Sequence, residues 1–267
     1  MKYLIAALLA LGTMSAGAHA QDSAPVAQIT VLGEVHDNPA HHLVQEEWVA
    51  RIEPAALVFE MLSPEQVKAA QGIDRHDGEA LQAAFDWNAS GWPDFEMYAP
   101  IFAAAPDARL YGAALPKDTV RAAIAKGASA VFGPDAAKFG LGPIDGLELA
   151  QRVGEQNTAH CGMLPSSMLP GMVEAQRLRD AHFAQVALQA LDDTGGPVVV
   201  ITGDGHARKD WGIPAMIHAA RPDVTVFSLG QLEDGATTDP NLDTPPFDQV
   251  LTSPAPTGRG NPCEVFR

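Results

Sequence analysis

Short apolar runs that alternate with helical stretches constrain the fold of this chain more than any other feature. Signals that start or end helices stand between the runs, as at Asn38-Pro39 and Gly195-Gly196. This alternation is typical of βαβ units and predicts a largely parallel sheet. The expected strands are 28–32, 56–59, 109–113, 197–202 and 224–229, and the expected helices are 39–51, 117–126, 144–153 and about 168–191.

The first twenty residues carry the pattern of a cleavable signal peptide. Lys2 precedes an apolar run from Leu4 to Leu11, and Ala18-His19-Ala20 forms an A-x-A cleavage site. The apolar run is shorter than the roughly 20 residues that a membrane-spanning helix needs. We therefore expect cleavage near Ala20 and a mature chain that is periplasmic or secreted, without stable membrane insertion.

The remainder of the chain is long enough for a single α/β domain, which we expect to span residues 21–238. The proline-rich segment 239–267 is expected to be an extended tail packed on that domain. The formal net charge of −16 disfavours binding to nucleic acid, whose phosphates an acidic surface repels. The sequence does not decide between a monomer and a homodimer.

Two cysteines, Cys161 and Cys263, follow the cleavage site. A pair of cysteines in an exported chain is usually a disulfide, because that compartment is oxidising. The alternative is a thiolate ligand for a metal or haem, which would need reduced cysteines grouped with other ligands. We predict the disulfide, which would attach the tail to the loop before the long helix.

Ionisable side chains follow three of the expected strands. Glu34 and His36 follow the first, Glu60 the second, and His206 the fourth. Because ligands of parallel sheets bind beyond the carboxyl ends of the strands, we expect these side chains to lie together in a site. They suit catalysis by a general base with an orienting acid, and His36, Glu60 and His206 also suit a divalent metal. Alternatively, each residue caps a helix or fixes a loop.

Several ordered motifs give the chain a family resemblance. The segment from Leu32 to His42 resembles the opening motif of the ChaN-like haem-binding uptake proteins of the Tiki superfamily. The later segments that resemble family motifs in the same order are Glu60, 92–98, 160–162, 172–180, 203–206 and 212–214. The resemblance implies a single-domain, three-layer α/β/α fold. It also implies a relationship to metal-dependent peptidases and erythromycin esterases, in which the strand-end residues do chemistry.

The resemblance implies haem as the cofactor, and haem needs an axial ligand and cations for its propionates. We predict Tyr98 and His160 as candidate ligands, because they lie near loops beside two of the motifs. Gln176 and Arg179 share one face of the long helix with Asp180 and are expected to point into the site.

The leading hypothesis is a periplasmic haem- or iron-binding protein of the ChaN type that serves iron acquisition. The main alternative is a metal-dependent or His/Glu-based hydrolase, of the Tiki or erythromycin esterase type, that uses Glu34, His36, Glu60 and His206 as catalytic residues. A third is an interaction module that retains the fold without the chemistry. The strand-end cluster by itself suits an enzyme at least as well as a haem carrier.

Overall fold

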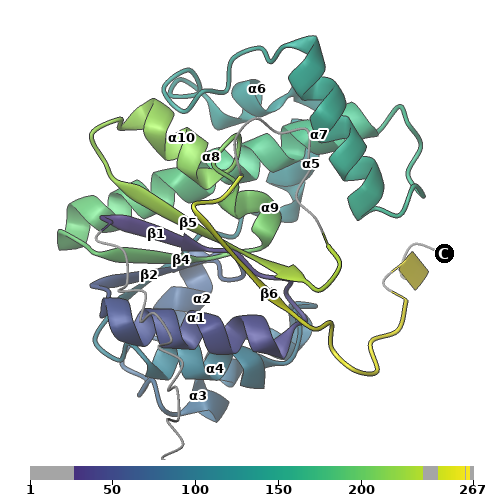
Figure 1. Cartoon of the computed structure of the whole chain (residues 1–267). Coiled ribbons are helices and arrows are strands. Elements are labelled where there is room, and N and C mark those ends of the chain that lie inside the picture. Colours follow the sequence, from purple (N-terminus) through teal and green to yellow (C-terminus); the bar gives the residue numbers. More distant parts are fainter. Residues whose placement is uncertain (1–26, 237–245, 262, 265–267) are drawn as a thin grey trace, which may run out of the picture.

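The computed structural model describes residues 27–236, 246–261 and 263–264, so the expected signal peptide lies outside the described residues. Within them, six strands form one sheet in the order β3-β2-β4-β1-β5-β6 (Figure 1), and every neighbouring pair is parallel. The strands are β1 (Ile29–Leu32), β2 (Ala56–Phe59), β3 (Arg109–Gly112), β4 (Val198–Ile201), β5 (Val226–Glu233) and β6 (Gln249–Ser253).

Helices lie between the consecutive strands from β1 to β5 and cover both faces of the sheet (Figure 1). The longest, α8, ends at the left-handed Gly195. The helices are α1 (Pro39–Ile52), α2 (Pro64–Ala69), α3 (Gly78–Ala84), the 3₁₀ turn η1 (Trp87–Ala89), α4 (Phe95–Ala103), α5 (Lys117–Lys126), α6 (Ala128–Phe132), α7 (Gly146–Ala159), α8 (Leu169–Thr194), α9 (Asp204–Ala207) and α10 (Ile213–Ala220).

Alternate residues of each central strand enter different hydrophobic cores. In β1, Val31 packs into the core shared with α8 and α10, whereas Leu32 packs into the core shared with α1 and α4. All four residues of β1, β2 and β4 are buried, as expected of strands covered on both faces. The structure thus confirms the predicted three-layer α/β/α fold with a parallel sheet.

The chain after residue 238 contributes more to the fold than the sequence predicts. Gln249–Ser253 forms β6, which pairs with β5 as the sixth strand of the sheet. Lys209 donates a backbone hydrogen bond to Pro246, and Asn38 donates its side-chain amide to Pro254. The described part of the predicted tail therefore includes an element of the sheet. Prolines on both sides made this five-residue strand hard to predict from the sequence.

The strand order places three loops side by side. β4 lies between β2 and β1, so the residues that follow these strands meet at one edge of the sheet. The chain leaves β1 for α1 on one face, whereas after β4 it continues through α9 to α10 on the other. Neighbouring strands whose connections leave toward opposite faces create a crevice, which is where ligands bind in open α/β sheets.

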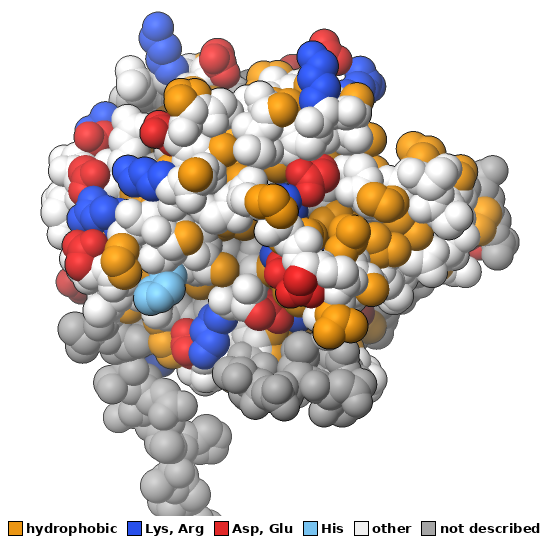
Figure 2. All heavy atoms as spheres, turned by 90° about the horizontal axis from the view of Figure 1, so that it is seen from above, with side chains coloured by type: hydrophobic (Ala, Val, Ile, Leu, Met, Phe, Trp, Pro, Cys, Tyr) orange, Lys and Arg blue, Asp and Glu red, His pale blue; other side chains and the backbone are white. Residues whose placement is uncertain are grey.

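The described surface carries both signs of charge. Figure 2 shows acidic, basic and hydrophobic side chains interspersed over the face seen from above, so the acidic excess is not gathered into one patch on this face. Among the described residues, no helix combines the length and apolarity that crossing a bilayer requires.

A disulfide joins Cys161, directly after α7, to Cys263 near the C-terminus. The bond spans 102 residues of sequence and ties the segment after β6 to the connection between α7 and α8. The structure therefore contains the predicted disulfide.

Removing this disulfide is expected to destabilise the protein. Cross-linking residues so far apart restricts the unfolded chain, and disulfides of this kind stabilise folded proteins by about 2–4 kcal/mol. We expect the Cys161→Ser/Cys263→Ser variant to show a free energy of unfolding lower by about this amount in denaturant titrations. Wild-type protein titrated with reductant should match the variant, and equal stability with and without reductant would contradict the prediction.

Candidate functional site

A cleft of about 800 Å³ opens at the carboxyl edge of β1, β2 and β4. This volume falls in the range of roughly 300–1,000 Å³ that ligand sites occupy. Its lining includes all four strand-end residues named from the sequence, namely Glu34, His36, Glu60 and His206. Gln176 and Arg179 of α8 also line it, as expected from their shared helix face. We call this space the main cleft.

Glu60 is the most connected group of the main cleft. Its buried carboxylate accepts hydrogen bonds from the Thr202 hydroxyl at 2.7 Å and from the Gly203 amide at 2.9 Å, and Arg179 donates to its other oxygen. Burial raises the pKa of Glu60, but the positive charges of His206 and Arg179 outweigh it, so its pKa lies well below the ordinary value. Glu60 is therefore an anion that links β2, β4 and α8.

His206 lies between two carboxylates. Its Nδ1 donates to the buried Asp180 of α8, and its Nε2 is 3.5 Å from Oε1 of Glu60. Burial lowers the pKa of the His206 imidazole. The charges of Glu60 and Asp180 raise it by more, so the pKa lies above the ordinary value of histidine. Burial also raises the pKa of Asp180. Both ring nitrogens of His206 are thus engaged by protein groups.

His36 forms a second histidine–carboxylate pair, and this one is open to the cleft. Its side chain is 32% exposed, and Nδ1 is 2.6 Å from Oε1 of the fully buried Glu34. The Tyr98 hydroxyl donates to the same oxygen at 2.7 Å. Burial opposes protonation of His36, but the hydrogen bond to Glu34 and the charges of Glu60 and Glu34 prevail and raise its pKa to about 9.

The absence of a side chain at Gly203 makes room for His36. A Cβ at Gly203 would lie 2.9 Å from Nε2 of His36 and 3.8 Å from Oε2 of Glu60. Nε2 therefore lies directly over the backbone of the β4 loop, near Glu60. Glycine is needed here because the imidazole packs so closely against the main chain.

The arrangement does not support the predicted metal site of His36, Glu60 and His206. Among residues 27–236, 246–261 and 263–264, no group of three or more His, Cys, Asp or Glu side chains is placed to hold a metal ion. The physical reason is that Glu60 is paired with Arg179 and that both nitrogens of His206 face carboxylates. A cation bound there would have to displace these partners.

Two of the predicted haem ligands are placed differently from the expectation. Tyr98 is 0% exposed, and its hydroxyl donates a hydrogen bond to Glu34. Burial and the Glu34 carboxylate both raise the pKa of this hydroxyl. It positions Glu34 and is not accessible as an axial ligand. His160 follows the end of α7, where Nδ1 lies 2.8 Å from the Gln156 carbonyl oxygen. Its neighbours Gln156 and Ala159 line the main cleft, whereas His160 itself does not.

Sequence reasoning did not assign several groups that shape the cleft. Asp180 is the carboxylate partner of His206. In the sequence, only its position four residues after Gln176 on the same helix indicated that it faces the site. Trp92 contacts the ring of His36 edge-on at 4.8 Å between ring centroids, and Trp211 also lines the cleft. Asp204 is partly exposed, but desolvation of its carboxyl raises its pKa to about 7.

Comparison with known proteins agrees with this fold. A family model described as haem-binding uptake, Tiki superfamily, ChaN matches residues 21–217. A solved structure of ChaN from Campylobacter jejuni, described as showing cofacial heme binding, is 20% identical, with 79% of this chain and 84% of that chain covered and a TM-score of 0.61. No curated protein sequence matches the chain.

Two further solved structures share a coarser likeness. A succinoglycan biosynthesis protein and a Bacillus cereus protein are each 12% identical, with TM-scores of 0.37 and 0.35. The alignments cover 78% and 80% of this chain, and 66% and 67% of those chains.

The parallel α/β sheet, with a cleft at its carboxyl edge that several ionisable groups line, places the chain among proteins that bind a small molecule at the ends of their strands. More particularly, the chain belongs to the ChaN family of haem-binding uptake proteins in the Tiki superfamily.

The His36–Glu34 pair gives a direct prediction. NMR titration of wild-type protein is expected to show His36 titrating near pH 9, since Glu34 favours the imidazolium. In Glu34→Gln, the pKa should fall toward the ordinary value of about 6.5. Tyr98→Phe, which removes one hydrogen bond to Glu34 but no charge, is the control and should keep the pKa raised. An unchanged pKa in Glu34→Gln would contradict the assignment.

Proposed function

We propose that this chain is an exported haem-binding protein for iron acquisition and that haem binds in the main cleft. The observation that carries the proposal is His36, a partly exposed imidazole whose Nδ1 is held by a buried carboxylate. Metal-bound histidines typically donate their second ring nitrogen to a carboxylate or carbonyl, which fixes the ring and makes the metal-bound nitrogen more basic. Nε2 of His36 is then the nitrogen suited to haem iron.

The walls of the main cleft suit a flat apolar ring. The partly exposed Trp92 and the buried Trp211 and Val173 line the cleft, and Arg179 contributes a cation at 31% side-chain exposure. Ligand sites commonly combine mostly apolar walls with a few placed polar groups. The family membership supports the same ligand, because the matched family is described as haem-binding uptake.

Export and iron acquisition rest on other observations. The n-region, apolar run and A-x-A site within residues 1–20 support export. The disulfide between Cys161 and Cys263 is consistent with an oxidising compartment. The family description supports a role in haem uptake, and iron acquisition is the use that we infer for it.

The alternative function is hydrolysis by histidine–carboxylate catalysis. It is favoured by the two pairs, His36 with Glu34 and His206 with Asp180, that flank Glu60. A histidine held by a carboxylate is a general arrangement for moving protons in catalysis. His36 is the more accessible of the two histidines, so it would act on a reactant, and His206 would fix Glu60.

Haem titration followed by visible absorbance separates the two functions. We expect wild-type protein to shift the Soret band of haem at micromolar concentrations, and His36→Ala to weaken binding at least about tenfold through loss of the axial bond. His160→Ala is the matched control and should bind as wild type does. If wild type produces no shift, the haem proposal fails, whereas loss of binding only in His160→Ala would overturn the choice of ligand.

The affinity for haem should also depend on pH. An imidazole must lose its Nε2 proton before that nitrogen can bind iron, and His36 holds the proton up to a pH of about 9. Haem affinity measured between pH 6 and 9 is therefore expected to rise with pH, by up to about tenfold per unit where one proton is released. In Glu34→Gln the rise should level off at a lower pH. An affinity independent of pH would contradict iron binding by His36.

A further inference from the structure

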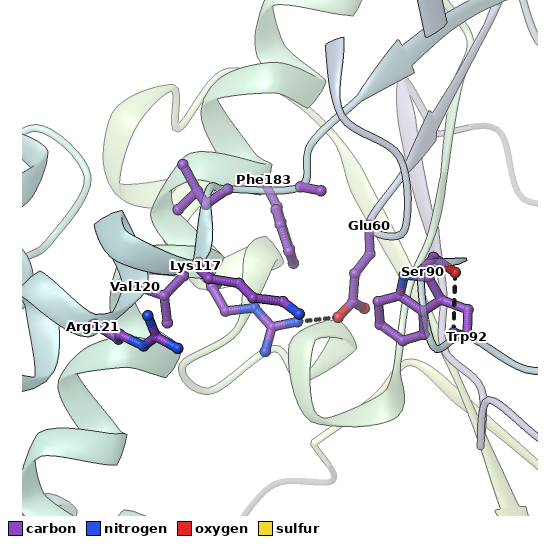
Figure 3. A pocket seen from close by; sticks show the side chains of 10 residues that line it. Glu60, Ser90, Trp92, Lys117, Val120, Arg121 and Phe183 are labelled. Atoms are coloured by element: carbon purple, nitrogen blue, oxygen red, sulfur yellow. Dashed lines mark hydrogen bonds and ion pairs between the residues drawn. The ribbon is translucent and has the colours of Figure 1, made fainter. Parts of the chain in front are cut away.

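The main cleft continues past Arg179 into a second space of about 450 Å³, which we call the side pocket. Glu60, Trp92 and Arg179 line both spaces, so a ligand in one borders the other. Figure 3 shows the side pocket between Phe183 of α8, Trp92 and the first turns of α5. Besides Glu60, its polar lining includes the side chains of Lys117 and Arg121.

The charge in the side pocket is opposite to that of the protein as a whole. The chain has 33 acidic residues against 17 lysines and arginines. Among the described residues that line the side pocket, in contrast, three are basic and only Glu60 is acidic. Glu60 already receives Arg179, Thr202 and the Gly203 amide. These three partners therefore compensate the charge of Glu60 without Lys117 or Arg121.

Two exposed cations of α5 line this space. Lys117 and Arg121 are four residues apart, so they lie on the same face of α5 as Val120, which also lines the pocket. Figure 3 shows Lys117 extending toward Glu60, and Arg121 lying farther along the helix. Arg121 pairs with the exposed Asp118, whereas Lys117 forms no ion pair with any residue of the described ranges. The positive end of the α5 dipole adds to the potential there.

Apolar side chains border these charges. Leu115, Val120, Trp92 and Phe183 line the same pocket as the basic groups, and the Arg179 guanidinium lies 5.7 Å from the centre of the Phe183 ring. The Arg179 side chain is 31% exposed, so water screens its charge less than that of Arg121, which is 72% exposed. The side pocket thus combines positive charge with apolar surface next to the main cleft.

We propose that the side pocket receives the carboxylate groups of the bound ligand, with Lys117 and Arg121 as the residues that select for them. The proposal rests on the function proposed above, and it defines the ligand class as a flat apolar ring with acidic arms on one edge. For haem, the arms are the two propionates, and Lys117 and Arg121 neutralise them in a protein that otherwise repels anions.

The test compares haem with haem dimethyl ester, in which both propionates are uncharged. We expect Lys117→Gln/Arg121→Gln to bind haem at least about tenfold more weakly than wild type, the loss typical of one charge-assisted hydrogen bond. Affinity for the ester should be the same in the variant and in wild type. The control Lys126→Gln/Lys138→Gln removes the same charge from residues that line neither space and should bind haem within about twofold of wild type.

The outcomes separate this proposal from the one on which it rests. Wild type that binds neither haem nor the ester overturns both. Wild type that binds haem, with a Lys117→Gln/Arg121→Gln variant of equal affinity, overturns the side pocket alone. Equal losses for haem and for the ester also overturn it, because they would indicate a change in the shape of the cleft.

Discussion

The buried carboxylate of Glu60 is the group on which the rest of the site depends. It lies at the end of β2 inside the protein, where removing one partner of a buried ion pair typically costs about 3–5 kcal/mol. The structure compensates it from three directions, with Thr202 and Gly203 after β4, Arg179 of α8, and His206. These contacts hold the loops after β2 and β4 against α8. Glu60 and Arg179 lie where the main cleft meets the side pocket.

This arrangement divides the histidines into two roles. His206 is enclosed by Glu60 and Asp180, so its positive charge serves the internal network. His36 is anchored through Nδ1 by Glu34, and the Tyr98 hydroxyl in turn donates a hydrogen bond to Glu34. The partly exposed imidazole of His36 therefore has a defined position although the residue lies in a loop. A site built in this way holds its ligand-binding atom in place through a second set of buried contacts.

The sequence predicted the fold well because its strongest signals are local. The runs 56–59 and 198–201 are apolar throughout, as expected of strands buried on both faces, and both are central strands of the sheet. β6 was missed because Gln249–Ser253 is short and partly exposed at the edge of the sheet. Its place in the sheet is decided by tertiary contacts such as the backbone bond from Asp234 to Ser253.

The site was only partly predictable for a related reason. Strand ends reveal which residues meet at the edge of a parallel sheet, so Glu34, His36, Glu60 and His206 could be grouped from the sequence. Accessibility cannot be read in the same way. Tyr98 lies in a plausible loop-proximal position, yet its side chain turns into the core to bond Glu34. Lys117 and Arg121 belong to no recognisable sequence motif. The packing of α5 against α8 brings them to the side pocket.

A crystal structure of the mature chain with bound haem would show whether His36 binds the iron. We expect density for the ring in the main cleft, with the iron bonded to Nε2 of His36, the His36–Glu34 hydrogen bond retained, and the propionates in the side pocket next to Lys117 and Arg121. Iron bonded to Tyr98 or His160, or a ring bound outside the main cleft, would contradict this expectation.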